Sequence, residues 1–170
     1  MKDILLVDGY NMIGDWPELK SLAEKDMEEA REQLIRILAD YQGYSGLKVI
    51  LVFDAHLVPG LGGKMTQHGL EIIFTREKET ADECIERLVA QLDRQRRNII
   101  VATSDHIEQR ITFGKGALRL SARELRLAVL ESREEMERKI EEKSQKPRNS
   151  FDLKLNRETK HILEKWRRGE

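Results

Sequence analysis

The chain has 170 residues, of which 36% are charged and 5% aromatic, and its formal net charge is −1. This length suits one α/β domain with a modest extension, and the balanced charge excludes a general basic field, so any nucleic-acid surface must be local. The single cysteine, Cys84, excludes an internal disulfide and a cysteine-based zinc cluster, which fits a reducing cytoplasm.

Short apolar runs that stop at turn residues alternate with segments whose apolar residues recur at helical spacing. The chain opens directly into such a run, and no apolar stretch approaches about 20 residues, so we expect neither secretion nor a membrane span. In chain order we predict a strand at 4–7, a helix at 24–41, a strand at 47–53, a loop at 57–69, a strand at 70–75, a helix at 81–95 and a strand at 98–102. There follow a short helix through 112, an edge strand at 117–120, a long helix at 121–144, a break at 147–150 and a final amphipathic helix from about 156.

This alternation predicts an α/β fold of three layers, in which helices cover both faces of a central, mostly parallel sheet. Right-handed crossovers place the carboxyl ends of parallel strands along one edge, and ligands of open α/β sheets bind outside that edge. Asp8, Asp54 and Asp105 each follow a predicted strand, so we expect all three carboxylates at the same edge.

A fourth acidic group comes from Glu79-Thr80-Ala81-Asp82-Glu83, which opens the helix predicted after the third strand. Taken alone, the two acids that follow Ala81 suit the first turn of a helix, and Thr80 suits its N-cap. Carboxylates that converge on one edge repel one another unless a positive charge lies between them, and no lysine or arginine stands in the strand-end motifs. We therefore predict a divalent cation, and oxygen ligands favour Mg²⁺ or Mn²⁺.

Such a site suits hydrolysis of a phosphodiester bond, because one or two metal ions can activate water and stabilise the leaving oxygen. Nearby polar side chains would orient the carboxylates. We expect Asn11 to hold Asp8 through its side-chain amide, and Thr103 or Ser104 to fix Asp105 or to contact a phosphate.

The acidic motifs resemble those of a known family. Leu6-Val7-Asp8-Gly9-Tyr10-Asn11-Met12-Ile13 resembles the opening motif of NYN domains, whose fold is related to that of PIN nucleases. Three later segments resemble the later motifs in the same order, and the match is best with the bacterial YacP-like branch: Val52-Phe53-Asp54-Ala55, Glu79-Thr80-Ala81-Asp82 and Ala102-Thr103-Ser104-Asp105.

The resemblance covers about residues 2–145 and implies a PIN-like NYN nuclease domain over 1–145, followed by a basic extension, 146–170, that we expect to be helical. It implies a metal-dependent endoribonuclease that cleaves messenger RNA in the ribosomal A site. The alternative is a catalytically inactive module that binds RNA or the ribosome. A receiver domain and a haloacid-dehalogenase-type phosphatase fit poorly, because only one acid follows the first predicted strand.

The same resemblance assigns roles to the acids. Carried over residue by residue, the metal ligands are Asp8, Asp82 and Asp105, and Asp54 is a supporting acid. Mg²⁺ or Mn²⁺ is the implied cofactor, with no small-molecule cofactor besides it.

Basic and polar residues near the acidic edge are expected to contact RNA, because phosphate contacts supply much of the affinity for nucleic acid. A solvated charged surface is the other interpretation of each. The expected substrate contacts are Asn11, Lys64, Arg76, Lys78, Ser104, Arg119 and Arg123. His56 and His106 adjoin the predicted acids and are weaker candidates for a general acid, whereas Cys84 is expected to be a packing residue.

Overall fold

The computed structural model describes residues 2–55, 63–92, 97–104 and 116–145, together with Lys165, Arg167 and Gly169. Contacts divide the chain into two units, Met1–Ser132 and Arg133–Glu170, and the sheet lies entirely in the first. The division falls inside the long helix α6 (Ala122–Gln145). The expected C-terminal helix lies almost wholly outside the described residues, so the extension over 146–170 stays a prediction.

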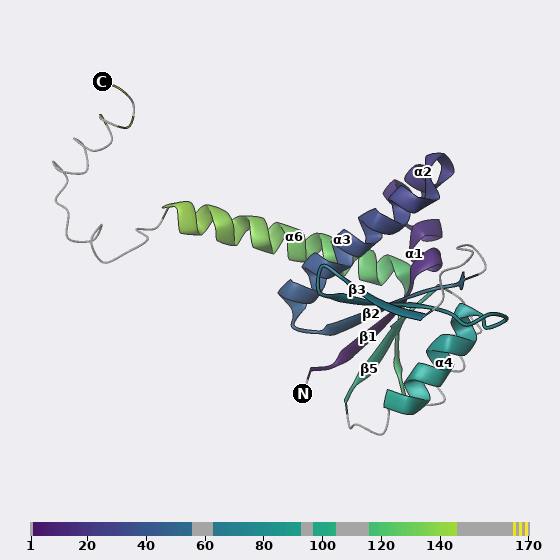
Figure 1. The fold of residues 1–170 in the computed structure, drawn as a ribbon. Coiled ribbons are helices and arrows are strands. Elements are labelled where there is room, and N and C mark those ends of the chain that lie inside the picture. The colour runs from purple at the N-terminus through teal and green to yellow at the C-terminus, as the bar shows by residue number, and fades with distance from the viewer. Residues whose placement is uncertain are drawn as a thin grey trace. The chain divides into compact units, whose positions relative to one another are not determined.

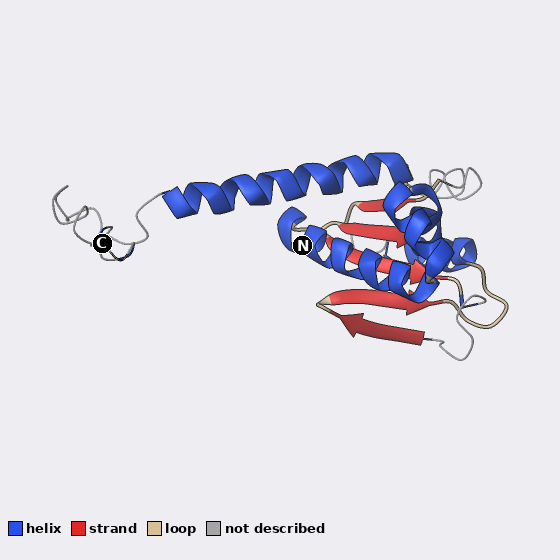
Figure 2. Cartoon of the chain, turned by 90° about the horizontal axis from the view of Figure 1, so that it is seen from above, coloured by secondary structure: helices blue, strands red, loops and turns tan. Residues whose placement is uncertain are grey.

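The described residues of the first unit form a six-stranded sheet in the order β3-β4-β2-β1-β5-β6 (Figure 1). Neighbouring strands pair in parallel throughout, except that β3 runs antiparallel to β4 (Figure 2). The bounds are β1 Ile4–Asp8, β2 Lys48–Phe53, β3 Gly63–Gln67, β4 Leu70–Phe74, β5 Ile99–Ala102 and β6 Leu118–Leu120. The mostly parallel sheet and the edge strand β6 are therefore confirmed.

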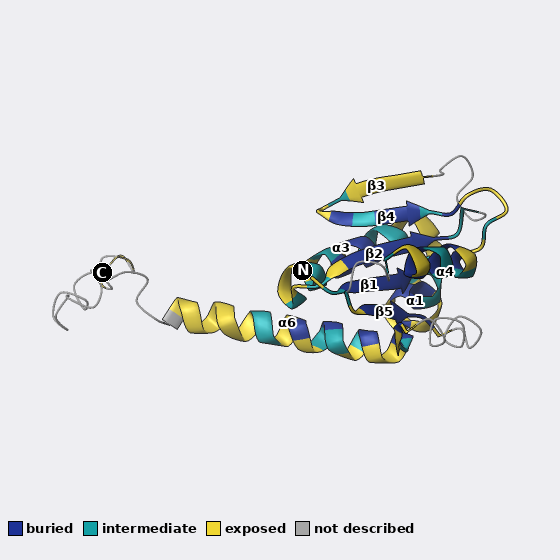
Figure 3. Cartoon of the chain, turned by 90° about the horizontal axis from the view of Figure 1, so that it is seen from below, coloured by how far each residue is buried: buried dark blue, intermediate teal, exposed yellow. Residues whose placement is uncertain are grey.

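Helices cover both faces of this sheet, as the continuous apolar runs of its central strands require. One face packs against α1 (Gly9–Asp15), α2 (Pro17–Lys25), α3 (Met27–Ser45) and the first turns of α6, and the other against α4 (Ala81–Leu92). Successive residues of β1 alternate between the two hydrophobic clusters, with Leu5 and Val7 in one and Ile4 and Leu6 in the other. Figure 3 shows the buried central strands beside the exposed edge strand β3.

Two short helices between β1 and α3 were not predicted. The residue that separates them, Trp16, is extended, and Pro17 opens α2 at a position where its missing N–H costs nothing. Asp26, with φ of −156°, then ends α2 and caps α3 through its side chain. These interruptions break the apolar period, so the helix predicted over 24–41 begins later, at Met27, and it continues to Ser45, where Gly46 is its left-handed C-cap.

The predicted loop over 57–69 was also wrong in its second half, because Gly63–Gln67 form β3. Exposed side chains and several glycines hid this strand from a pattern search. Its position depends on pairing with β4 through a tight turn at His68 and Gly69, whose φ values of 53° and 79° are left-handed.

The first turns of α6 are fastened to the helices that follow β1. A capping box opens α6, since the Glu124 amide donates to Ser121 Oγ at 3.1 Å and the Ser121 amide donates to Glu124 Oε1 at 3.4 Å. Trp16 Nε1 donates to the Ala122 carbonyl at 2.8 Å, and Arg126 donates to both carboxylate oxygens of Glu18 at 3.0–3.3 Å. No helix within the described ranges is long and apolar enough to cross a membrane.

Candidate active site

The carboxyl ends of the parallel strands place the predicted acids along one edge of the sheet. Asp8 ends β1 opposite Val52 of β2, so Asp54 lies two residues beyond the same level. α4 begins after the carboxyl end of β4, which brings Asp82 to this edge as well. Asp8 is 5% exposed, and Asp54 and Asp82 are partly buried. Asp105 lies outside the described residues.

Asp8 is held by Asn11, as the sequence predicted. The Asn11 side-chain amide donates to Asp8 Oδ2 at 2.7 Å, and the Asn11 backbone amide approaches Asp8 Oδ1 at 3.4 Å as Asp8 caps α1. The side-chain nitrogen of Asn11, Nδ2, also donates to Thr103 Oγ1 at 3.1 Å, and Ser104 Oγ donates to Asn11 Oδ1 at 2.9 Å. Asn11 therefore joins the ends of β1 and β5 and fixes the carboxylate plane of Asp8.

Asp54 lies in a backbone segment that Thr75 holds from the neighbouring strand end. The Thr75 amide donates to the Phe53 carbonyl at 3.0 Å, and Thr75 Oγ1 accepts from the Ala55 amide at 2.9 Å. Thr75 is 1% exposed, so these bonds are shielded from water. Asp54 thus stands between two backbone groups that are both fixed to the end of β4.

Tyr10 and Arg31 adjoin this edge, and sequence reasoning assigned neither of them a role. The Tyr10 ring lies 5.1 Å from that of Phe53, and Arg31 of α3 donates to the Tyr10 hydroxyl at 3.4 Å. Burial raises the pKa of Tyr10; the Arg31 guanidinium opposes this, and the Asp54 carboxylate adds to it. The position of Tyr10 between Asp8 and Asn11 could have indicated that it lies near the site. Its contact with Arg31 joins residues 21 positions apart and could not be predicted from a sequence pattern.

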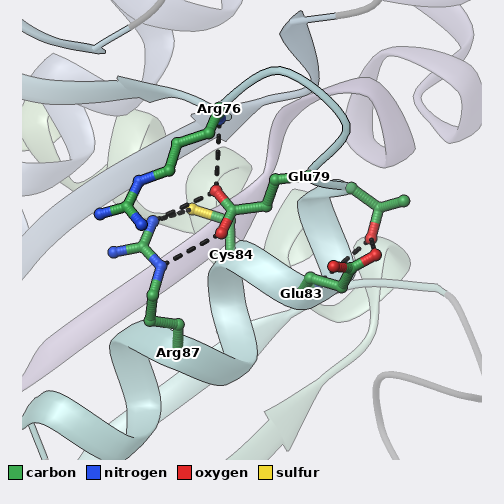
Figure 4. A network of polar contacts seen from close by, with 6 residues as sticks. Arg76, Glu79, Glu83, Cys84 and Arg87 are labelled. Atoms are coloured by element: carbon green, nitrogen blue, oxygen red, sulfur yellow. Dashed lines mark hydrogen bonds and ion pairs between the residues drawn. The ribbon is translucent and has the colours of Figure 1, made fainter.

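Glu79, the first acid of the motif that opens α4, is already paired with an arginine. Arg87 of α4 donates through Nε and Nη2 to the two Glu79 oxygens at 3.1 and 3.2 Å (Figure 4). Partial burial raises the pKa of Glu79, but hydrogen bonds from Arg87 and from the Arg76 amide outweigh it and leave the pKa below its usual value. Asp82 is the residue of this motif that we predicted to be a metal ligand.

Thr80 is the predicted cap of α4. Its hydroxyl accepts from the Glu83 amide at 3.2 Å and lies 3.3 Å from Glu83 Oε1, and the Cys84 amide donates to the Thr80 carbonyl at 3.0 Å. Glu83 therefore belongs to a capping arrangement. Asp82 is in the first turn between these groups, so the position of its backbone depends on how α4 begins.

The predicted RNA-contacting cations are all exposed, but they do not form one patch. Arg76 and Lys78 lie in the β4–α4 connection, close in sequence to Asp82. Lys64 lies on β3 with its Nζ 4.0 Å from Glu71, whereas Arg119 lies on β6 at the other edge of the sheet. Arg123 is in the first turn of α6, and the two candidate histidines, His56 and His106, lie outside the described residues.

The donor chemistry of this edge fits a divalent cation, although a full ligand set is not visible in the described part of the chain. Among the described residues no three His, Cys, Asp or Glu side chains lie close enough together to hold a metal ion. Asp8, Asp54 and Asp82 supply hard carboxylate oxygens at one sheet edge, and the fourth predicted acid, Asp105, is not described. A hollow of about 530 Å³ is at the opposite edge, lined partly by Lys2, Lys48 and Arg97, away from these acids.

Cys84 is a buried packing residue, as predicted, and its thiol should be inert. It is 0% exposed; burial, and then the Glu79 carboxylate, raise the pKa of the thiol to about 11. At pH 8 roughly one thiol in a thousand is then ionised. We expect Ellman's reagent to modify the native protein more than about a hundredfold slower than the urea-unfolded protein. Rapid modification of the native protein at pH 8 would contradict this.

Known proteins share both the sequence and the fold of the chain. The model of the YacP-like NYN domain family matches residues 5–168, beyond the 2–145 stretch in which the motifs were recognised. The "Uncharacterized protein YacP" of Bacillus subtilis (strain 168) is 53% identical over 173 residues, which cover 99% of this chain and 98% of that protein.

Two crystal structures of Rae1 (YacP) from Bacillus subtilis are similar to the chain. One has a TM-score of 0.75 and 53% identity, with 98% of this chain and 95% of that chain covered. The other, a point mutant, has a TM-score of 0.75 and 51% identity, with 85% of each chain covered. The chain therefore belongs to the YacP-like NYN domain family.

Proposed function

We propose that the chain is a divalent-metal-dependent endoribonuclease that hydrolyses phosphodiester bonds of RNA. The observation that carries this proposal is the pair Asp8 and Asn11, in which a nearly buried carboxylate at a strand end is oriented by an amide that also joins the next strand end. The cap of α1 accounts for the bond from the Asn11 backbone, whereas the second bond, from the Asn11 side chain to Asp8 Oδ2, orients the carboxylate in the way that neighbouring hydrogen bonds orient metal ligands. Membership of the family supports a nuclease over other α/β activities.

The proposed ligands are Asp8, Asp82 and Asp105, with Asp54 as a supporting acid. Mg²⁺ or Mn²⁺ would supply a nucleophilic water at neutral pH and charge for the leaving oxygen. Asn11 orients Asp8 by its 2.7 Å hydrogen bond, so the carboxylate pays little reorganisation when it binds a cation. Asp54, fixed between Phe53 and Ala55, is suited to orient the attacking water.

RNA would approach this edge along exposed cations. Arg76 and Lys78 stand beside the motif that contains Asp82, and we propose that they contact the phosphates on either side of the cut. Ser104, exposed and bonded to Asn11, is placed for a contact with the same strand. In this arrangement the carboxylates at the sheet edge bind the metal ion, and the flanking cations bind the phosphate backbone of the RNA.

We further propose messenger RNA in the ribosomal A site, in the cytoplasm, as the substrate. Its support is the resemblance of the four acidic motifs to those of the YacP-like branch, which implies cleavage of messenger RNA in the ribosomal A site. The basic extension over 146–170 would then contribute contacts to ribosomal RNA, because basic segments bind phosphate backbones without sequence preference.

The test is cleavage of one messenger RNA, free and on translating ribosomes, with Mg²⁺, with Mn²⁺ and with EDTA. We expect cuts that require both the ribosome and the metal. Cuts in free RNA alone would keep the nuclease and remove the ribosome from the proposal. If neither RNA is cut while the protein binds ribosomes tightly, the chain is the inactive binding module instead.

A further inference from the structure

The connection between β4 and α4 is fastened by an arginine that lies eight residues beyond its partner. Arg87 donates two hydrogen bonds to the Glu79 carboxylate, and the side chains are only 30% and 13% exposed. A paired, two-bond arrangement of this kind fixes direction as well as distance. The hydrogen bonds raise the pKa of Arg87 and lower that of Glu79, so both groups stay charged at neutral pH.

The same carboxylate closes the turn that leads into α4. Glu79 Oε1 accepts from the Arg76 amide at 3.3 Å, and the Glu79 amide donates to the Arg76 carbonyl at 2.9 Å. Between them Lys78 has a φ of +67°, a left-handed conformation that costs a lysine about 1 kcal/mol. Without these bonds to Glu79 the turn would relax toward right-handed conformations.

Asp82 follows this turn by three residues, in the first turn of α4. Its backbone is located on one side by the Thr80 cap and on the other by the 76–79 turn that Glu79 closes. Figure 4 shows Arg87 extending along α4 toward Glu79, with the thiol of Cys84 beside it. Loss of the Arg87 guanidinium would loosen the start of α4 and would leave the Glu79 carboxylate with the nearby charge of Arg76 but without its hydrogen-bonded counter-ion.

We propose that Arg87 is a positioning residue for the carboxylate site: through Glu79 it fixes the start of α4, and hence Asp82, and keeps Glu79 from competing for the metal. This inference rests on the proposed function. Arg87 touches neither metal nor RNA. Its loss should therefore have opposite effects on metal binding and on turnover. Removing the arginine makes the site more negative, which favours binding of a cation, but the position of Asp82 that turnover requires is no longer fixed.

The experiment compares Arg87→Gln with Arg126→Gln in the full chain. Arg126 pairs with Glu18 between α6 and α2 through three hydrogen bonds of 3.0–3.3 Å, in a more exposed position, so it controls for the loss of an arginine–glutamate pair as such. Three quantities are measured: hydrogen exchange of the Glu83 and Cys84 amides, binding of Mn²⁺ alone by electron paramagnetic resonance, and cleavage of messenger RNA on translating ribosomes at saturating Mn²⁺.

For Arg87→Gln we expect at least fivefold faster exchange at the two α4 amides, Mn²⁺ binding as tight as or tighter than in the wild type, and about tenfold lower turnover. The double variant Glu79→Gln/Arg87→Gln should bind Mn²⁺ as tightly as the wild type, while its turnover stays low. Arg126→Gln should leave all three unchanged.

Unchanged exchange at Glu83 and Cys84 in Arg87→Gln would overturn the inference, and so would turnover equal to that of Arg126→Gln. A wild-type protein that cleaves no RNA would refute the proposed function instead. In that case the exchange measurement still decides whether Arg87 fixes the start of α4.

Discussion

Asp8→Asn should reduce RNA cleavage by about a thousandfold while the protein still folds. Loss of a metal-binding charge removes several kcal/mol of transition-state stabilisation, and each 1.4 kcal/mol or so is tenfold in rate. Asparagine keeps one acceptor oxygen at this position, so at most one hydrogen bond at the start of α1 is lost and the fold is retained. The measurement is cleavage of messenger RNA on translating ribosomes at saturating Mn²⁺, together with urea unfolding of the same preparation.

The substitution also carries a predictable cost in stability. Asp8 accepts hydrogen bonds on both oxygens, at 2.7 Å from the Asn11 side chain and at 3.4 Å from its backbone, but asparagine has only one acceptor oxygen. Its amide group must face one of the two donors. We expect it to give up the longer bond, at a cost of about 1 kcal/mol in the free energy of unfolding.

Asp26→Asn is the matched control for this experiment. Asp26 caps α3 as Asp8 caps α1, with its carboxylate 3.2 Å from the Glu29 amide, but it lies on an exposed surface between helices. The same loss of one charge at the same kind of position should leave cleavage within about twofold of the wild type. Retained cleavage in Asp8→Asn would remove Asp8 from the proposed metal site.

The parts of the fold that follow from local patterns were predictable from the sequence. The apolar runs of β1, β2, β4 and β5 each end in a polar turn, and the right-handed crossover rule then fixes their common edge. The convergence of Asp8, Asp54 and the start of α4 on that edge follows from this logic. By contrast, β3 depends on pairing with β4 more than on its own composition, so its five residues looked like a loop.

The contacts that give the site its geometry were mostly beyond the reach of pattern reasoning. The expected bond between Asn11 and Asp8 is local, but the bonds that join Asn11 to Thr103 and Ser104 span more than 90 residues. Glu79 and Arg87 are eight residues apart, with the end of the β4–α4 connection and about two turns of α4 between them. Side-chain pairs within a helix are three or four residues apart, so this pairing could not be predicted from helical spacing. Such contacts are set by packing of whole elements, and a list of acids cannot show which of them is already neutralised.

A second large effect is expected at Gly9, the residue after Asp8. A Cβ built on Gly9 would lie 2.3 and 2.6 Å from Cε1 and Cδ1 of Phe53, far inside van der Waals contact. The Phe53 ring is 0% exposed and lies between the rings of Tyr10 and Phe74, with centroids 5.1 and 5.8 Å away, so it has little room to retreat. Gly9 is thus required by the close approach of α1 to β2.

Gly9→Ala should therefore lower the free energy of unfolding by about 2–3 kcal/mol, as overpacking of a well-filled core does. The sign is informative, because alanine in place of glycine within a helix normally stabilises by up to about 1 kcal/mol. Gly14→Ala in the same helix is the control: nothing lies within 4 Å of its Cβ, so stability should rise or stay level. Urea unfolding followed by circular dichroism measures both variants. Equal stability of the two would mean that Phe53 yields freely and that the α1–β2 contact does not fix the position of Asp8.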